Sequence, residues 1–82
     1  DKVIENIDFL FIDGDHSRVG VIDDFNNYRN KVNKGGLIVF DNYSDPNWPE
    51  VKDAVDFLVD IHAITYKIHS KYGHCLVLEK LV

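Results

Sequence analysis

The sequence predicts an α/β domain with a partial doubly wound sheet, in the order β-α-β-α-β-β, ending in an antiparallel hairpin. Two observations predict the parallel part, because two short apolar runs are each followed by a segment with helical periodicity. A strand that returns to its own sheet through a helix makes a right-handed crossover and lies parallel to the first. A third observation, two short strand-like segments joined by a glycine turn, predicts the final hairpin. The expected architecture is therefore Rossmann-like.

The first strand–helix unit begins with Ile7–Ile12, which reads IDFLFI and is almost continuously apolar. Such a run is typical of a strand that is buried on both faces. Ser17 is a suitable N-cap for the next helix, and the segment from Asn33 to Gly36 is a suitable end. The apolar stripe of this helix has residues at spacings of one helical turn, namely Val21, Phe25, Tyr28 and Val32.

The second unit begins with a buried strand over residues 37–40, and Pro49 suits the first turn of the helix that follows. The apolar stripe of that helix is Val51, Ala54, Val55 and Leu58. Ile64, Tyr66 and Ile68 then alternate with polar residues, which predicts a half-exposed strand. A turn at Gly73 leads into the last strand, residues 75–80.

Length and composition limit the possible functions. A chain of 82 residues allows one small domain, and its start at Asp1 without any methionine indicates part of a longer protein. The net charge of −5 argues against nucleic acid as a partner, because phosphate contacts need a basic face. No apolar run is long enough to cross a membrane. The single cysteine cannot form an internal disulfide, so we expect a cytoplasmic protein.

Acidic residues follow both predicted parallel strands, at the edge of the sheet where ligands of α/β proteins bind. Asp13, Asp15 and His16 follow the first strand, and Asp41 and Asn42 follow the second. Neighbouring strands lie ~5 Å apart, so these oxygens could share a cation such as Mg²⁺ or Mn²⁺. The alternative is that the same residues only cap helices and form turns.

Three further residues near this edge are candidates for the site. A histidine beside carboxylates can act as a general base, so His16 is a catalytic candidate, although its position at a helix start by itself favours a side chain that faces solvent. Tyr43 and Trp48 follow the second strand and could line a substrate pocket. For Trp48 the alternative is a hydrophobic staple before the second helix.

Two segments, FLFIDGDHS and NKGGLIVFDNYSDPNWPEVKDAVDFL, together resemble the C-terminal half of class I S-adenosylmethionine-dependent methyltransferases. The most similar branch is the metal-dependent small-molecule O-methyltransferases. The resemblance extends over residues 7–80 and implies that residues 1–82 are the C-terminal half of such a domain. The N-terminal half, which carries the glycine-rich cofactor turn, is absent from this sequence. We therefore expect the chain to be inactive alone.

The resemblance also implies roles for individual residues. The divalent cation of the metal-dependent members would be bound here by Asp13, Asp41 and Asn42. His16 stands at the position of the family's base, which is often a lysine, so the base here would be an imidazole. The edge that could touch S-adenosylmethionine comprises Asp13, Gly14, His16 and Ser17.

Two other functions compete with this one. Asp13-Gly14-Asp15 after a buried strand also resembles the nucleophile and acid pair of haloacid dehalogenase-type phosphatases, although no lysine is convincingly placed for that chemistry. The third possibility is a non-catalytic half-domain that self-associates to cover an exposed sheet edge. A homo-oligomer with a small-molecule substrate is the assembly we expect.

Overall fold

The computed structural model describes residues 7–13 and 16–82. Within them the chain has a mixed α/β fold, as the sequence predicts, with one four-stranded sheet and two α-helices. In chain order the elements are β1 (Ile7–Ile12), α1 (Arg18–Tyr28), the 3-10 helix η1 (Arg29–Lys31), β2 (Val32–Phe40), α2 (Pro49–Ile61), β3 (Tyr66–Tyr72) and β4 (Cys75–Lys80). Neither described α-helix combines the length and the apolar character that crossing a bilayer requires.

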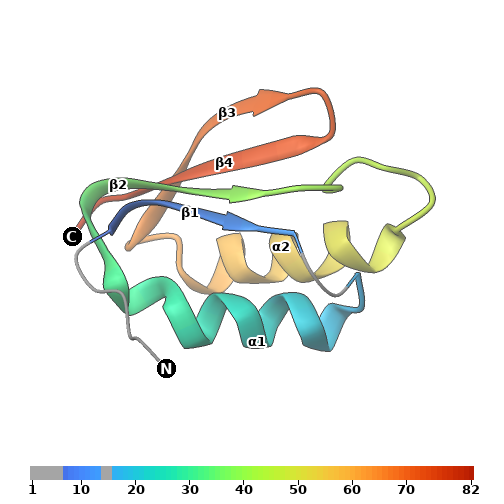
Figure 1. The fold of residues 1–82 in the computed structure, drawn as a ribbon, viewed down its shortest axis with the longest axis horizontal. Helices are drawn as coiled ribbons and strands as arrows, with labels where there is room; N and C mark the ends of the chain where they lie inside the picture. Colours follow the sequence, from blue (N-terminus) through green and yellow to red (C-terminus); the bar gives the residue numbers. More distant parts are fainter. Residues whose placement is uncertain (1–6, 14–15) are drawn as a thin grey trace.

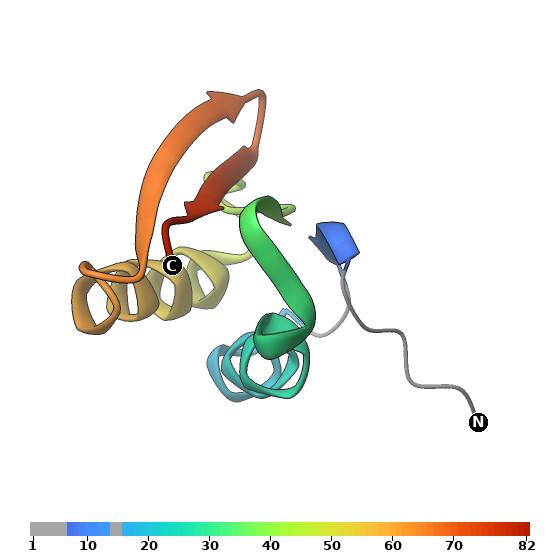
Figure 2. The same cartoon turned by 90° about the vertical axis from the view of Figure 1, so that its left-hand side faces the viewer.

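The four strands lie in the order β1-β2-β4-β3. β1 and β2 are parallel, while β4 is antiparallel to both of its neighbours. Both helices pack against the same face of the sheet, side by side, as Figures 1 and 2 show. The carboxyl ends of β1 and β2, the loop after β2 and the first turns of both helices gather at one end of the molecule (Figure 1).

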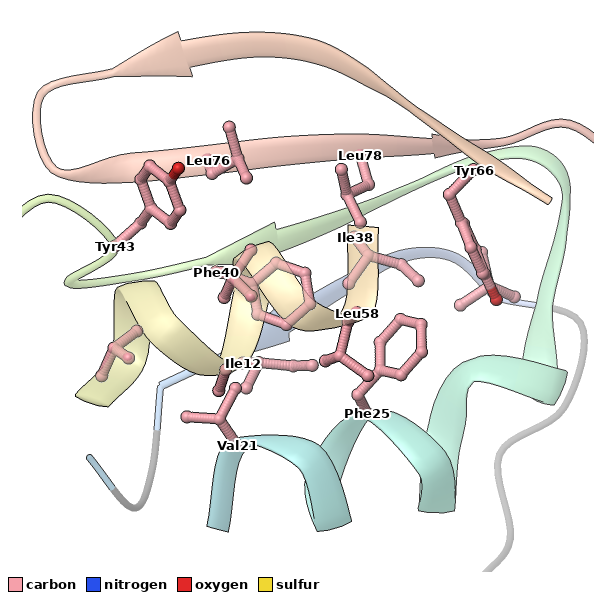
Figure 3. Close-up of a cluster of buried hydrophobic side chains, with 14 residues drawn as sticks. Ile12, Val21, Phe25, Ile38, Phe40, Tyr43, Leu58, Tyr66, Leu76 and Leu78 are labelled. Carbon is pink, nitrogen blue, oxygen red and sulfur yellow. The ribbon is translucent and has the colours of Figure 1, made fainter. Parts of the chain in front are cut away.

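The hydrophobic core fills the space between the sheet and the two helices (Figure 3). Phe25 of α1 and Leu58 of α2 are almost completely buried, and they face Ile38 and Phe40 of β2. From β4, Leu76 and Leu78 complete this layer. The apolar stripes of both helices pack against this layer. Burial of these side chains is therefore what holds the helices to the sheet.

The opposite face of the sheet is open among the described residues, which corrects one sequence-based prediction. We expected β1 to be buried on both faces, but Phe9 and Phe11 are 57% and 48% exposed. These side chains alternate with the core residues Leu10 and Ile12 along the strand. The open face has a cavity of about 300 Å³, lined among others by Phe9, Leu37, Val39, Tyr72, Cys75 and Val77.

The helix predicted to contain Val32 ends earlier than expected. α1 stops at Tyr28, and Val32 is the first residue of β2, where it pairs with Ile7. The chain then bulges, because Phe9, two residues after Ile7, pairs with Leu37, five residues after Val32. The segment from Asn33 to Gly36, which we predicted as the end of the helix, therefore forms an irregularity inside β2.

The segment between α2 and β3 also differs from the prediction. Ile64 lies before β3 and is 87% exposed, and Ile68 is 50% exposed, so only Tyr66 of the predicted alternation is buried. His62 is half-buried at the C-cap of α2, where a nitrogen of Arg29 lies 3.0 Å from its Nδ1. Burial and the positive charge of Arg29 lower the pKa of His62.

The bulge in β2 makes a testable demand on Gly36. A Cβ atom there would lie 2.6 Å from Val32 Cγ1 and 2.9 Å from the carbonyl oxygen of Asn33. We expect Gly36→Ala to lower the free energy of unfolding by about 1–3 kcal/mol, as overpacked substitutions do. Urea denaturation of the full-length protein measures this change.

Gly35→Ala is the matched control. Space is open around Gly35, but its φ of +84° strains an L-residue by about 1 kcal/mol. Unchanged stability in the Gly36 variant, measured beside the expected loss in the Gly35 variant, would contradict the steric argument for Gly36.

Candidate functional site

The pairing of β1 with β2 brings together the acidic residues that follow these two strands. Ile12 and Phe40 are partners at the ends of these parallel strands. The backbone N–H of Asp41 donates to the carbonyl oxygen of Ile12 at 3.1 Å, which continues the ladder one residue beyond β2. Asp13, the residue after Ile12, therefore follows β1 directly beside the point where Asp41 follows β2. The two strands are therefore neighbours, which is the condition that the cation hypothesis required.

Asn42 has the most constrained backbone at this end of the sheet. Its φ is +64°, the left-handed region that asparagine tolerates better than most residues. Its backbone N–H donates to Asp41 Oδ1 at 2.8 Å. Its side-chain Nδ2 lies 2.8 Å from His16 Nε2. Since an amide nitrogen only donates, Nε2 of His16 accepts this bond.

Trp48 supplies the second contact to His16. The two rings are stacked, with their centroids 4.0 Å apart and their planes inclined by 12°. Trp48 is itself the N-cap residue of α2, and its side chain remains 41% exposed. His16 thus contacts Asn42, which follows β2, and Trp48, the N-cap residue of α2. Neither sequence-based interpretation of Trp48 included this contact, and its role in lining a substrate pocket stays a prediction.

Tyr43, the other aromatic candidate, lies in the core rather than on the open edge (Figure 3). It is 8% exposed, and its hydroxyl donates to Asp56 Oδ1 at 2.6 Å. Lys52 donates to the other oxygen of Asp56 at 2.7 Å. Tyr43 therefore fixes the loop after β2 to α2, and Trp48 is the exposed aromatic ring beside His16.

The pKa values of Tyr43 and Asp56 are shifted in opposite directions. Burial, followed by the hydrogen bond and negative charge of Asp56, raises the pKa of Tyr43. Burial would also raise the pKa of Asp56, but hydrogen bonds from Lys52 and Tyr43 and the positive charges of Lys52 and Lys71 outweigh it and lower that pKa. Asp56 therefore remains an ionised acceptor. Asp56 was not among the predicted site residues. The sequence shows only that it lies four residues after Lys52, which is the spacing of a helical ion pair.

The start of α1 is fixed by two hydrogen bonds. Ser17 is its N-cap, as predicted, and its Oγ accepts from the N–H of Gly20 at 3.0 Å. Glu50 of α2 accepts from the backbone N–H of Arg18 at 2.9 Å. Both helices are thus tied together beside the candidate site. Of the residues predicted to touch the cofactor, Gly14 lies outside the described residues.

Cys75, the first residue of β4, is a neighbour of the site that was not among the predicted site residues. Its Sγ lies 3.4 Å from Asp41 Oδ1, and its side chain is half-buried on the open face of the sheet. Burial, the hydrogen bond to Asp41 and the negative charges of Asp41 and Asp13 raise the pKa of the thiol. The carboxylates of Asp41 and Asp13 therefore both contribute negative potential at the Cys75 thiol.

The donor set suits a hard divalent cation. Two carboxylates and an amide oxygen at the ends of adjacent strands are the ligand types that Mg²⁺ and Mn²⁺ prefer. Across residues 7–13 and 16–82, no three His, Cys, Asp or Glu side chains form a metal-binding group. The predicted set contains only two residues of those four types, Asp13 and Asp41, so a cation there would need Asn42 and water as further ligands.

Comparison with a solved structure identifies the class of fold. The structure of the O-methyltransferase NovP superposes with a TM-score of 0.77 over 95% of this chain and 31% of NovP. The sequence identity is 24%, so this likeness concerns the fold alone. The fold is that of an α/β methyltransferase.

Sequence comparisons identify the family. A family described as a methyltransferase domain matches residues 2–43, about half of the chain. The chain belongs to this family, and it is similar to class I S-adenosylmethionine-dependent methyltransferases. Protein R132 of Acanthamoeba polyphaga mimivirus is 54% identical over 68 residues, which cover 80% of this chain. The chain spans only 31% of the length of R132, and the same share of NovP.

The reactivity of Cys75 tests whether the carboxylate of Asp41 lies close to its thiol. Only the thiolate reacts with iodoacetamide, so the raised pKa of Cys75 should make its alkylation slow at pH 8. Asp41→Asn removes a negative charge and should accelerate alkylation several-fold, measured at Cys75 by mass spectrometry. Asp60→Asn, an exposed change at the far end of α2, is the control. Equal rates in both variants would contradict the proximity of Asp41 to the thiol.

Proposed function

We propose that the protein transfers the methyl group of S-adenosylmethionine to an oxygen atom of a small molecule, assisted by a divalent cation. The observation that carries this proposal is the arrangement at the ends of β1 and β2. Asp13 and Asp41 follow neighbouring strands, and His16 is hydrogen-bonded to Asn42. Membership of the methyltransferase family supports the reaction type.

Asp13, Asp41 and Asn42 are the residues that would hold the cation. When bound, the cation supplies positive charge that lowers the pKa of an acceptor hydroxyl and orients it. Asn42 can serve this site with its Oδ1, while its Nδ2 holds His16 until an acceptor hydroxyl takes its place at Nε2. The hydrogen bond from the Asn42 backbone N–H to Asp41 Oδ1 holds the Asp41 carboxylate against the Asn42 backbone.

His16 is the residue that would receive the proton of the acceptor. The lone pair of Nε2 now accepts from Asn42, so a substrate hydroxyl at the same position would replace that amide as the donor. An imidazole is suited to this transfer near neutral pH. S-Adenosylmethionine, when bound, supplies an electrophilic methyl group. Asp13, His16 and Ser17 are the described residues proposed to lie beside it.

The cation proposal is tested by direct binding of Mn²⁺ to the full-length protein, measured by calorimetry. Asp41→Asn removes a charged ligand and should weaken Mn²⁺ binding at least about tenfold, in line with the loss expected when a metal site is disturbed. Asp60→Asn makes the same change of charge away from the site and should leave the affinity unchanged. Unchanged Mn²⁺ affinity in the Asp41 variant would remove Asp41 from the site.

The cofactor proposal predicts a difference between residues 1–82 and the full-length protein. This sequence has no glycine-rich strand–helix turn of the kind that binds S-adenosylmethionine in relatives. Calorimetry should therefore detect tight binding of S-adenosylmethionine by the full-length protein and none by residues 1–82 alone. Micromolar binding by residues 1–82 would contradict the idea that other residues are required.

A second candidate function, association of two copies of the chain, is favoured by a specific observation. Phe9 and Phe11 expose large apolar surfaces on the open face of the sheet, next to the cavity there. Contiguous apolar surface of this kind marks interaction sites. The phosphatase alternative has less support, because the family match is to methyltransferases. Asp15, which that alternative needs, lies outside the described residues.

A further inference from the structure

His16 is restrained by two contacts that act in different directions. The stacked indole of Trp48, 4.0 Å away between ring centroids, limits tilting of the imidazole plane. The hydrogen bond with Asn42, 2.8 Å at Nε2, limits rotation of the imidazole within that plane. Neither contact alone determines the direction of Nε2, so both are needed to fix it.

The indole itself is attached to a well-supported piece of backbone. The N–H of Trp48 donates to the carbonyl oxygen of Asp45 at 3.0 Å, and its own carbonyl accepts from Val51 at 3.1 Å in the first turn of α2. Pro49 follows immediately and fixes its own φ. Asp45 is in turn 3.8 Å from His74 in the turn between β3 and β4. The ring thus projects from a segment held at both ends.

Packing of the core does not explain the position of the indole. Trp48 is 41% exposed and is not among the buried residues between the sheet and the helices. Tyr43, on the same loop, provides the attachment to the core instead. Replacing Trp48 should consequently leave no cavity in the core, and the variants should fold.

We propose that Trp48 is a positioning residue that holds the imidazole of His16 with Nε2 as the acceptor and Nδ1 carrying the proton. The importance of this role for methyl transfer rests on the proposed function, whereas the orientation of His16 does not. Without the stacked indole, His16 would turn away from Asn42, and its Nε2 would lose the direction in which a substrate hydroxyl must donate.

The orientation is tested by long-range proton–nitrogen NMR of the imidazoles in the full-length protein, at a pH where they are neutral. In the wild type, His16 should be the tautomer with the proton on Nδ1, and its ring protons should be shifted upfield by the indole. Trp48→Phe retains a stacking ring and should retain both signatures. Trp48→Ala should give a mixture of tautomers and lose the upfield shift.

The consequence is tested by kinetics with a hydroxyl acceptor on which the full-length protein is active. Trp48→Ala should lower kcat about 10- to 100-fold, as misplacement of a reacting group does, with KM for the acceptor nearly unchanged. Trp48→Phe should restore most of kcat. Tyr28→Ala, which removes an equally exposed aromatic ring at the other end of α1, is the control and should keep wild-type kcat.

The outcomes separate the two claims. Unchanged tautomer and ring-proton shifts in Trp48→Ala would overturn the positioning role. A changed tautomer with unchanged kcat would overturn its importance for the reaction. If the wild type transfers no methyl group to any hydroxyl acceptor, the proposed function fails, while the NMR comparison still decides whether Trp48 positions His16.

Discussion

The parallel pairing of β1 with β2 is the interaction on which the candidate site depends. It aligns Ile12 with Phe40, and the bond from the Asp41 N–H to the Ile12 carbonyl extends the alignment past the end of β2. Both strands present an apolar residue to the core at this point, Ile12 at 6% and Phe40 at 0% exposure. A slip of one residue would turn these side chains away from the helices. The burial that sets the register therefore also sets which polar residues meet beyond it.

The helices contribute a second constraint, because both begin at the end of the sheet where the two strands stop (Figure 1). Ser17 and Glu50 both accept hydrogen bonds from backbone N–H groups in the first turn of α1. The Arg18 guanidinium lies over the ring of Phe57, 4.8 Å from its centroid, and so links α1 to α2 again. Since His16 precedes α1 and Trp48 is the N-cap of α2, this link between the helix starts helps to keep the two stacked rings together.

The sequence was sufficient for the element types and for the neighbourhood of Asp13 and Asp41, because apolar periodicity and strand order are local features of the chain. It was insufficient where the outcome depended on distant partners. Ile7–Ile12 reads as buried on both faces, yet which face helices cover is decided by the rest of the protein. Val32 continues a helical stripe in sequence, but pairing with Ile7 places it in β2. Likewise, nothing local to Trp48 indicates that its ring stacks on His16.

Asn42 joins the fold to the chemistry, because each of its polar groups has a separate task. Its left-handed φ of 64° lets the backbone N–H return to Asp41 while the side chain points to His16. The next residue, Tyr43, is anchored by Asp56, so the strained residue lies between a strand end and a buried hydrogen bond. Such strain persists only where surrounding contacts determine it. An aspartate could adopt the same backbone, but its ionised carboxylate would have no N–H to donate to His16 Nε2. The amide is thus the group that can offer an oxygen to a cation and a donor to a neutral imidazole at once.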